Sequence, residues 1–355
     1  MERYIRNFNW PIVIFTLILN CLGLATLLSL SQSLFYQQLI MTIVCLVLFW
    51  IFTRIDFSLY HYLATPIYVF CLLFLMLTFL GPNVRGSTRW LEIMGFRLQP
   101  SEIVKPFLIL CWTSFLIKYP PDKLRNVFKN IGLFLLPWIL VFRQPDLGNA
   151  IVYFGIWLTA IILSGLPWKY IIGGGLIGII SLPLSYNLLQ HYQQLRLLIF
   201  FNPGLDPKGA GYNAIQAMIA VGSGSWFGRG FGRGTQSLLK FLPEFHTDFI
   251  FASFSEEFGF IGALLLIVLY FVLLWQILKV ASNLIANQRA FIFTVSIFTL
   301  IFIQMVVNIG MNLGLMPITG ITLPLMSLGG SSLISIWVGL GILTASLNER
   351  KRNLI

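Results

Sequence analysis

The sequence predicts an all-α membrane protein with about ten transmembrane helices and one large loop outside the membrane. Of its 355 residues, 57% are hydrophobic and only 10% are charged, and the mean hydropathy is +0.86. Soluble globular domains carry about 25% charged residues, so water could not solvate this much apolar surface. About 20 apolar residues span a bilayer, and several runs reach that length. Lys and Arg cluster in the short links between the runs, as is typical of membrane proteins.

Ten apolar runs are expected to form the spans of a single membrane domain, residues 1–355. They lie near residues 10–30, 34–53, 62–80, 103–117, 131–142, 148–165, 168–187, 249–278, 289–312 and 333–347. The fifth run is short, with Pro137 inside it and Pro145 after it, so a kinked or partial span is expected there. The first run is too long for the apolar core of a signal peptide and is expected to remain as a span.

Loop charge gives the predicted orientation. An even number of spans places both termini on one side of the membrane. If that side is the cytoplasm, it receives 13 of the 23 basic residues but only four of the 12 acidic ones. The inner side then carries a net charge of +9 and the outer side +2, which is the asymmetry expected of cytoplasmic loops. The total of +11 is thus spread over loops, and no nucleic-acid partner is expected.

Two outer segments are expected to be ordered. The loop 188–248 is long, rich in glycine and aromatic residues, and only moderately apolar. We expect short helices near 214–221 and 238–242 that lie on the membrane or dip into it. The last outer link, 316–332, combines prolines, glycines and hydroxyls. Irregular backbone at membrane depth persists only where protein covers it, so a re-entrant element is expected.

Asp248 stands where the long loop meets the run 249–278. Partial desolvation there should raise its pKa, which suits a general base that takes a proton from a sugar hydroxyl or water. A helix N-cap is an equally good interpretation of an Asp at this position. Glu256 and Glu257 lie two turns further on, on other faces of a straight helix, and are expected to pair with neighbouring helices. Glu92 and Asp206 are expected to be ordinary loop acids.

Two further sites place acids beside the membrane. Glu102 and Lys105 are spaced to pair on one helix face. A buried pair in a membrane must be mutually compensated, so it is either functional or a structural brace. Asp146 opens the sixth run and is either functional or an N-cap. The four cysteines lie in apolar runs and the three histidines are scattered, so no metal cluster is predicted.

Basic residues also gather on the outer side. Arg229 and Arg233 alternate with glycines over 228–234, and flexible backbone beside guanidinium groups suits an anionic group such as a lipid phosphate or pyrophosphate. This stretch follows no strand, so it is not a dinucleotide-binding motif. The other outer cations are Arg85, Arg89, Arg97, Arg143, Arg196, Lys208 and Lys240.

Taken together, a series of short motifs resembles the SEDS family (shape, elongation, division and sporulation), over nearly the whole chain. The motifs are Gly86–Trp90, Gln99–Lys105, Gln144–Gly148, Asp206–Tyr212, Gly234–Ser237, Leu242–Phe251 with Glu256 and Glu257, Pro317–Gly320 and Gly329–Ser332. Each is weak alone, but their order on a chain of ten spans is specific. Three positions depart from the family pattern, namely Asn202, Asn149 and Leu328, and none of them touches the Asp248 motif.

The resemblance implies a peptidoglycan glycosyltransferase of cell elongation and shape, in the bacterial cytoplasmic membrane. Such proteins polymerise lipid II on the outer face: a GlcNAc 4-hydroxyl attacks the anomeric carbon of the donor, undecaprenyl pyrophosphate leaves, and the configuration inverts. Asp248 matches the family's essential aspartate, with general base as its implied role. The residues implied to bind substrate or support the site are Glu102, Lys105, Asp146, Arg89, Arg196, Arg229, Arg233, Lys240, His246 and Glu256.

Cofactor and partner expectations also follow from the resemblance. No cofactor is required by the sequence, although a divalent cation such as Mg²⁺ or Mn²⁺ would suit a diphosphate leaving group. The implied partners are a class B penicillin-binding protein, which is a transpeptidase with one span, and other membrane proteins of the elongation complex.

Two other functions compete with polymerisation. A lipid II flippase would also contain buried acids and broken helices, but it needs polar residues through the full depth of the membrane. Here the polar residues concentrate at the outer face. A non-catalytic scaffold for wall synthesis is the second alternative, and it predicts that Asp248 is dispensable.

Overall fold

A computed structural model describes residues 9–81, 88–93, 96–188, 191–206 and 209–353, which fold into a helical bundle. The first half contains α2 (Trp10–Leu30), α3 (Gln32–Arg54), α4 (Phe57–Tyr62), α5 (Ala64–Leu77), η1 (Thr78–Leu80), β1 (Leu91–Ile93), β2 (Phe96–Leu98), α6 (Pro100–Ile103), α7 (Lys105–Lys118), α8 (Leu124–Arg143) and α9 (Leu147–Leu163). The second half contains α10 (Trp168–Leu188), α11 (His191–Phe201), η2 (Pro203–Leu205), α12 (Ala210–Ser223), α13 (Thr235–Leu238), α14 (Ile250–Asn283), α15 (Gln288–Asn312) and α16 (Gly330–Asn353).

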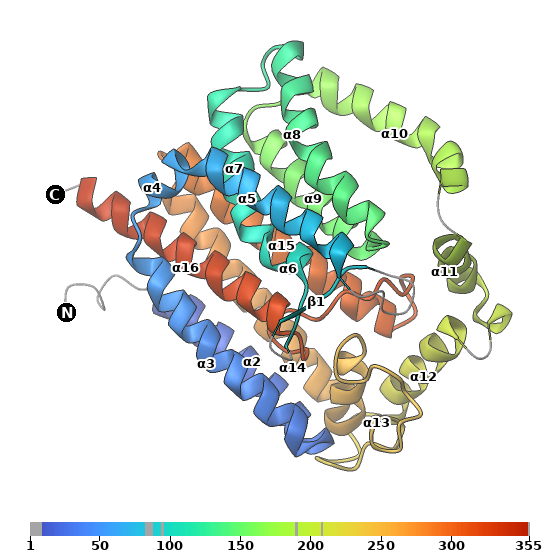
Figure 1. Ribbon diagram of the computed structural model, residues 1–355. Helices are drawn as coiled ribbons and strands as arrows, with labels where there is room; N and C mark the ends of the chain where they lie inside the picture. Colours follow the sequence, from blue (N-terminus) through green and yellow to red (C-terminus); the bar gives the residue numbers. More distant parts are fainter. Residues whose placement is uncertain (1–8, 82–87, 94–95, 189–190, 207–208, 354–355) are drawn as a thin grey trace.

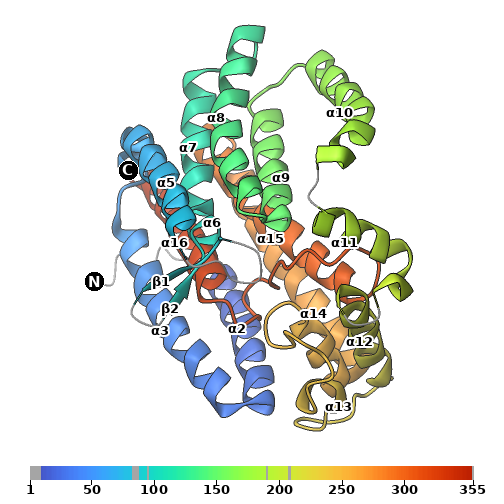
Figure 2. The same cartoon turned by 45° about the vertical axis from the view of Figure 1, so that its right-hand side comes forward.

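Helix α15 forms the centre of the bundle and packs against α14, α9, α7 and α16. Helices α2 and α3 lie on one side, where α3 packs along α16 and α2 along α14. Figures 1 and 2 show α5, α7, α8 and α9 on the other side, with α10 standing apart from them. The strands β1 and β2 form a small antiparallel hairpin in which Leu91 faces Leu98. Helix α15 is therefore the element against which helices from both halves of the chain pack.

The predicted fold class is confirmed, because each of the ten predicted spans overlaps a helix. Six helices (α2, α3, α8, α14, α15 and α16) are long and apolar enough to cross a membrane, and three shorter apolar helices accompany them over 64–80, 147–163 and 168–181. The third and fourth spans are each interrupted, at Leu63 and Val104. Proline at position 66 or 106 follows each interruption, and a proline cannot donate the backbone hydrogen bond that would continue the helix.

The fifth span was expected to be kinked or partial, and the partial alternative was wrong. Helix α8 is continuous over 20 residues and contains Pro137. Proline at this position removes the bond to the carbonyl of Leu133. The Tyr68 hydroxyl donates to that carbonyl at 2.7 Å, and Trp112 Nε1 donates to it at 3.4 Å. Side chains from α5 and α7 thus satisfy the carbonyl that the proline leaves unpaired, as a membrane interior requires.

The two outer segments are ordered where the structure describes them. Helix α12 contains the predicted helix 214–221, but the second predicted helix, 238–242, was wrong: α13 ends at Leu238, and Lys240 adopts a left-handed backbone conformation (φ +59°). The link after α15 is irregular, as predicted, and its Ile321, Leu323 and Met326 are at most 2% exposed. Parts of two family motifs (residues 86–87 and 207–208), together with Arg85 and Lys208, lie outside the described residues.

Candidate active site

The backbone at Asp248 is held by two amide side chains of α15. Asn308 Nδ2 donates to the Asp248 carbonyl oxygen at 2.9 Å, and Asn312 Nδ2 donates to the same oxygen at 3.1 Å. Asn312 Oδ1 also accepts from the Ala252 amide at 3.1 Å. The N-cap of α14 is Phe249, one residue further on, so the interpretation of Asp248 as the helix cap is wrong. The carboxylate is thereby left available for another role.

The irregular link between α15 and α16 closes over the same residues. Asn308 Nδ2 also donates to the Ile321 carbonyl at 2.7 Å, Ser327 Oγ donates to the Thr247 carbonyl at 2.6 Å, and the Leu328 amide donates to the His246 carbonyl at 2.9 Å. Gly320 has φ +76°, and a Cβ atom built there would lie 3.5 Å from Asp248 Oδ2. A glycine therefore permits both this backbone turn and close access to the carboxylate.

The charges around Asp248 tune its acidity. Asp248 is only partly exposed, and burial raises the pKa of its carboxyl to about 6, with the nearby Glu244 carboxylate adding to the rise. Arg89 and Arg196 oppose this rise in the pKa, as does the Thr247 hydroxyl. The pKa of His246 is lowered from its usual value by burial, although Glu244 acts against the shift, so its imidazole is neutral near pH 7. The result is a carboxylate that two arginines influence and that can still take up a proton near neutral pH.

Asp146 is both a helix cap and part of a polar cluster. Its Oδ1 accepts from the Asn149 amide at 3.2 Å, which confirms the N-cap interpretation for α9. Its Oδ2 accepts from Gln99 Nε2 at 2.7 Å and from Ser101 Oγ at 3.2 Å. Arg89 lies 3.9 Å from Asp146 and also acts on Asp248. Arg89 therefore connects the Asp146 cluster to the candidate base.

Glu102 and Lys105 form the predicted pair, deep in the bundle. Lys105 Nζ lies 2.6 Å from Glu102 Oε1, and the two side chains are 0% and 6% exposed. Gln304 Nε2 on α15 donates to Glu102 Oε2 at 3.3 Å. Lys105 also interacts electrostatically with Asp146. The pair thus lies beside the Asp146 cluster, and both the functional and the bracing interpretation remain predictions.

Glu256 pairs with the short helix α13 of the long loop, so the expected pairing with a neighbouring helix is confirmed. Its carboxylate accepts from the Gln236 amide at 2.9 Å and from the Thr235 hydroxyl at 3.2 Å, and it lies 3.9 Å from Arg229 Nε. Glu257 accepts from the Gly232 amide at 3.3 Å and also interacts with Ser29 of α2. For Glu257, pairing with a neighbouring helix is therefore confirmed.

Close backbone contact fixes the loop to a kink in α14. Gly259 interrupts α14 with φ +68°, and a Cβ atom there would lie 2.3 Å from the Gly228 amide nitrogen. The amides of Arg229 and Gly230 donate to the carbonyls of Glu256 and Glu257 at 2.9 and 3.0 Å. Gly228 and Gly259 thus permit this close approach of the two backbones. The side chains of Arg229, Arg233 and Lys240 are exposed. None of these three is placed against Asp248 by a described interaction, so their role in anion binding stays a prediction.

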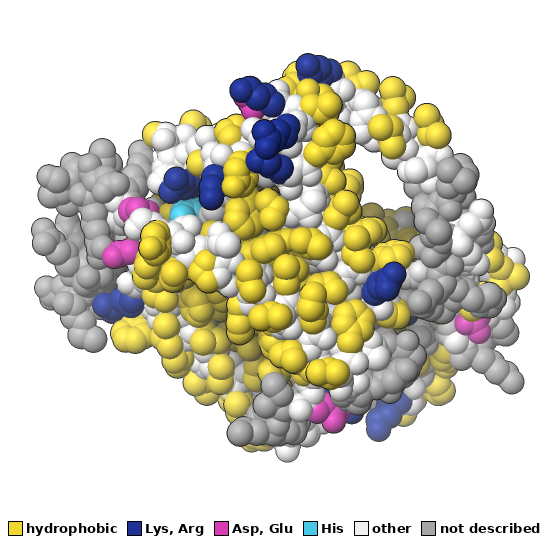
Figure 3. All heavy atoms as spheres, turned by 45° about the horizontal axis from the view of Figure 1, so that its top comes forward, with side chains coloured by type: hydrophobic (Ala, Val, Ile, Leu, Met, Phe, Trp, Pro, Cys, Tyr) yellow, Lys and Arg dark blue, Asp and Glu magenta, His cyan; other side chains and the backbone are white. Residues whose placement is uncertain are grey.

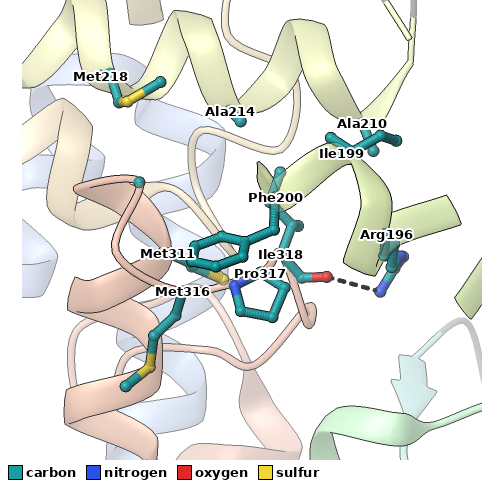
Figure 4. Close-up of a pocket in the computed structure, with 11 residues that line it drawn as sticks. Arg196, Ile199, Phe200, Ala210, Ala214, Met218, Met311, Met316, Pro317 and Ile318 are labelled. Carbon is teal, nitrogen blue, oxygen red and sulfur yellow. Dashed lines mark hydrogen bonds between the residues drawn. The ribbon is translucent and has the colours of Figure 1, made fainter. Parts of the chain in front are cut away.

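Arg196 reaches the site from α11. Its Nη1 donates to the Ile318 carbonyl at 3.2 Å, in the link that also covers Asp248 (Figure 4). Beside it lies a cavity of about 30 Å³ lined mainly by apolar side chains, among them Phe200, Met218 and Met311. This volume holds about one water molecule, so the cavity is too small for a sugar. Among the described residues, no group of three or more His, Cys, Asp or Glu could hold a metal ion.

Sequence reasoning missed Asn308, Asn312 and the proximity of Glu244 to Asp248. The two asparagines are i and i+4 in the apolar run 289–312, and polar residues inside a membrane span are usually functional. The signal that could have identified them is therefore their polar character within an apolar run. Glu244 was counted among the outer acids, but its proximity to Asp248 depends on a turn in which the amides of Thr247 and Phe249 both donate to the Glu244 carbonyl.

We predict that Asn308→Leu lowers the polymerisation rate that the family resemblance implies by more than the loss of the protein's stability explains. The change removes the two bonds that Asn308 Nδ2 donates and the one that Asn308 Oδ1 accepts from Asn312 Nδ2. The buried Ile321 carbonyl then loses its described side-chain donor, at a cost of about 1–3 kcal/mol, whereas the Asp248 carbonyl keeps the bond from Asn312. Asn130→Leu is the matched control, because Asn130 is equally buried and donates to two backbone carbonyls at 2.8 and 2.9 Å on another helix. Thermal unfolding and rate per folded molecule are measured for both. Equal rate losses would show that Asn308 does not position Asp248.

The fold and this site define a class: a multi-pass membrane protein with a carboxylate and arginine cluster at one end of its helices. The family model for FtsW, RodA and SpoVE, described as a cell cycle protein, matches residues 10–352, and the chain belongs to this family. The peptidoglycan glycosyltransferase MrdB of Escherichia coli (strain K12) is 37% identical over 311 residues, covering 86% of this chain and 83% of that protein. Stage V sporulation protein E of Bacillus subtilis (strain 168) is 34% identical over 354 residues, covering 94% of each.

Solved structures agree with this placement. One chain of a peptidoglycan synthase complex, in which polymerization and crosslinking are coordinated, matches with a TM-score of 0.84 and 28% identity, over 97% of this chain and 98% of that one. The rod shape determining protein RodA of Thermus thermophilus matches with a TM-score of 0.73 and 28% identity, over 97% of both chains. The resemblance to the SEDS family, and within it to RodA, is confirmed.

Proposed function

We propose that this peptidoglycan glycosyltransferase polymerises lipid II, with Asp248 as its general base. The observation that supports the assignment is a carboxylate with a raised pKa that is fixed through its backbone by Asn308 and Asn312. Asp248 takes the proton from the GlcNAc 4-hydroxyl of the acceptor as that oxygen bonds to the donor's anomeric carbon. The bond from this carbon to the diphosphate breaks on the opposite face, and its electron pair leaves with undecaprenyl pyrophosphate.

Arg89 and Arg196 are the cations best placed to stabilise the diphosphate. Both act on Asp248 from different segments, one before β1 and one on α11. Guanidinium groups bind phosphate oxygens with paired, charge-assisted hydrogen bonds. Asp146 holds Arg89 at 3.9 Å and so supports its position. A divalent cation would add positive charge at the diphosphate when bound, and its requirement stays a prediction.

A lipid-linked substrate must approach from the side, and the surface fits that requirement. Helix α10 stands apart from the bundle in Figure 1, and Figure 3 shows an opening between the two. The apolar side chains of α10 are exposed there, with Ile177 and Ile180 at 70% and 71%. Such a surface suits contact with a polyprenyl chain or with membrane lipid. We expect the isoprenoid tail to pass this opening while its sugar lies near Asp248.

The proposed orientation places Asp248 outside the cell and both termini in the cytoplasm. Helix α16 runs parallel to α3, because Gly330 lies beside Met41 and Gly341 lies beside Phe49. Since α2 and α3 are joined by Ser31 as a hairpin, α2 begins at the end of the bundle where α16 finishes. The charge asymmetry of the loops then supports assigning that end to the cytoplasm. A class B penicillin-binding protein is the proposed partner, because a structural relative comes from a peptidoglycan synthase complex.

The distribution of buried charge favours polymerisation over lipid II flipping. The buried charged side chains among the described residues are Glu102, Lys105, Asp146, Glu256 and Glu257. All five lie in the part of their helices that is near the Asp248 end. The opposite half of the bundle buries hydroxyl and amide groups but no charge among the residues the structure describes. A transport path for a diphosphate would need charge compensation through the whole depth.

The purified chain, with its transpeptidase partner, is therefore expected to make glycan strands from lipid II. The assay is run with and without moenomycin, and resistance separates this chain from a contaminating class A enzyme. A parallel liposome assay measures movement of lipid II across the bilayer. Transport without any polymer would support the flippase and contradict the proposal.

A further inference from the structure

The α2–α3 hairpin contacts the link between α15 and α16 where this link meets the segment that contains Asp248. Gln38 of α3 is buried, and its Nε2 donates to the Ser327 carbonyl at 3.0 Å. On α2, a Cβ atom built at Gly23 would lie 2.6 Å from the Met326 carbonyl oxygen, so this glycine lets the helix backbone approach the link directly. Two adjacent residues of the link are thus contacted by the two helices of one hairpin.

Ser327 pairs each of its polar groups. Its amide donates to the Leu323 carbonyl at 3.1 Å, and its hydroxyl accepts from the Leu323 amide at 2.8 Å. The same hydroxyl donates to the Thr247 carbonyl at 2.6 Å, and the Ser327 carbonyl accepts from Gln38. A shift of the Ser327 backbone would therefore move the hydroxyl that holds Thr247.

The backbone on both sides of the Asp248 Cα atom is held in this way. The Thr247 carbonyl belongs to the peptide unit before this atom and is bound by Ser327. The Asp248 carbonyl belongs to the unit after it and is bound by Asn308 and Asn312. Each peptide unit is planar and rigid, so fixing both units fixes the direction in which the side chain leaves the backbone. The asparagines of α15 hold only one of the two.

Burial of the Gln38 side chain has a cost that its hydrogen bond to Ser327 offsets only in part. Gln38 is 0% exposed within the second apolar run, and its buried Oε1 has no partner among the described residues. An unpaired buried amide oxygen costs about 1–3 kcal/mol, and an apolar side chain would avoid that cost. Packing of α3 alone therefore does not explain a glutamine here, whereas the bond from its Nε2 to Ser327 does.

We propose that Gln38 is a positioning residue for Asp248, on which it acts through Ser327 and Thr247. Its expected effect on the rate rests on the proposed function of Asp248 as the general base. Gln38 does not touch the reacting atoms; it fixes the peptide unit before the base. Small movements of that unit matter, because displacing a catalytic group by about 1 Å can lower a rate about 10²-fold.

Hydrogen exchange of the folded protein in detergent tests this route without reference to activity. Gln38→Leu removes the bond to Ser327, so the backbone amides of segments 323–328 and 244–249 should both exchange about three- to tenfold faster, as expected for the loss of one hydrogen bond. Exchange is followed by mass spectrometry of the peptides. Faster exchange in 323–328 alone, or in neither segment, would contradict the proposal.

Thr42→Val is the matched control. Thr42 is buried one turn further along α3, and its hydroxyl donates to Asn20 Oδ1 of α2 at 3.3 Å and to the Gln38 carbonyl at 2.8 Å. The change removes a polar contact within the hairpin and keeps the Gln38 side chain. Exchange in both segments and lipid II polymerisation should stay near the wild-type values, and thermal unfolding reports whether each variant is folded. Equal acceleration in both variants would contradict the role of the Gln38 amide.

Polymerisation kinetics then relate the position of the base to the rate. Gln38→Leu and Ser327→Ala should each lower kcat about tenfold or more and leave the KM for lipid II nearly unchanged, because only the base is displaced. The double variant should lose no more than the larger single loss, since both changes act through the same contact with Thr247. Losses that multiply, or a change in KM alone, would contradict the shared route. If the wild type makes no polymer while exchange changes as expected, the proposed function is wrong and the contact route is supported.

Discussion

Asp248→Asn is expected to reduce lipid II polymerisation by about 10²- to 10⁴-fold, which is the usual contribution of a general base. The amide keeps the shape of the carboxylate but cannot accept the hydroxyl proton. The backbone carbonyl of Asp248 is unchanged, so its bonds to Asn308 and Asn312 remain. We therefore expect the variant to fold and to bind lipid II while polymerisation fails. Rates are measured with saturating lipid II and the partner present.

The matched control is Asp206→Asn. Asp206 lies in the same long loop, and its carboxylate accepts the Ala210 amide at 2.9 Å in a turn, where an amide oxygen can replace it. We expect nearly wild-type polymerisation from this variant. A wild-type rate in Asp248→Asn would contradict the role of Asp248 as general base and would support the interpretation of the protein as a non-catalytic scaffold. Equal losses in both variants would mean that the loop, and not the carboxylate, is what matters.

The pH dependence of the rate gives an independent check on the same residue. Only the ionised carboxylate can take the proton, and the pKa of Asp248 is about 6. The rate should therefore be nearly constant above this pKa and fall about tenfold for each pH unit below it. Glu244→Gln removes the like charge that raises the pKa, so the midpoint should move to lower pH. A midpoint that does not move with Glu244→Gln would contradict the electrostatic account.

Most of the membrane topology could be predicted from the sequence, because hydropathy reports directly on lipid contact. The prediction of a partial fifth span was wrong for a reason that lies outside that segment of the sequence. Pro137 would break an isolated helix. In the bundle, Tyr68 and Trp112 from other helices donate hydrogen bonds to the Leu133 carbonyl that the proline leaves unpaired. No single-helix rule contains that information. The same holds for the kink at Gly259, which is stabilised by backbone contact with Gly228 from the long loop.

The charged residues of the candidate site could be predicted from the sequence, but the uncharged residues that hold Asp248 in place could not. Asp248, Asp146, Glu102 and Lys105 are rare ionisable residues beside a membrane, so they stand out. The residues that fix Asp248 are uncharged and about 60 or more positions away in the sequence, as with Asn308. Asp146 shows a different limit, because it is a helix cap and a ligand of the polar cluster at once. The sequence pattern suggested a helix cap or a functional carboxylate as alternatives, whereas the structure gives Asp146 both a cap bond and a place in the polar cluster.

The largest effect on stability is expected from breaking the Glu102–Lys105 pair. Lys105→Met leaves Glu102 as an uncompensated charge at a buried position, and loss of one partner of a buried pair costs about 3–5 kcal/mol. Glu102→Gln should cost a similar amount, because Lys105 is then unpaired. The double variant carries no buried charge at this position, so its thermal stability should return to nearly that of the wild type. Thermal unfolding of all four proteins completes the cycle.

Activity of the double variant then separates the two interpretations of the pair. If Glu102 and Lys105 only brace the helices, polymerisation should return together with stability. We expect it to stay low, because Lys105 also offsets the charge of Asp146, and Asp146 is the carboxylate beside Arg89. Without Lys105, Arg89 is drawn more strongly to Asp146 and is less available to the diphosphate near Asp248. Full recovery of the rate in a stable double variant would assign the pair to structure alone.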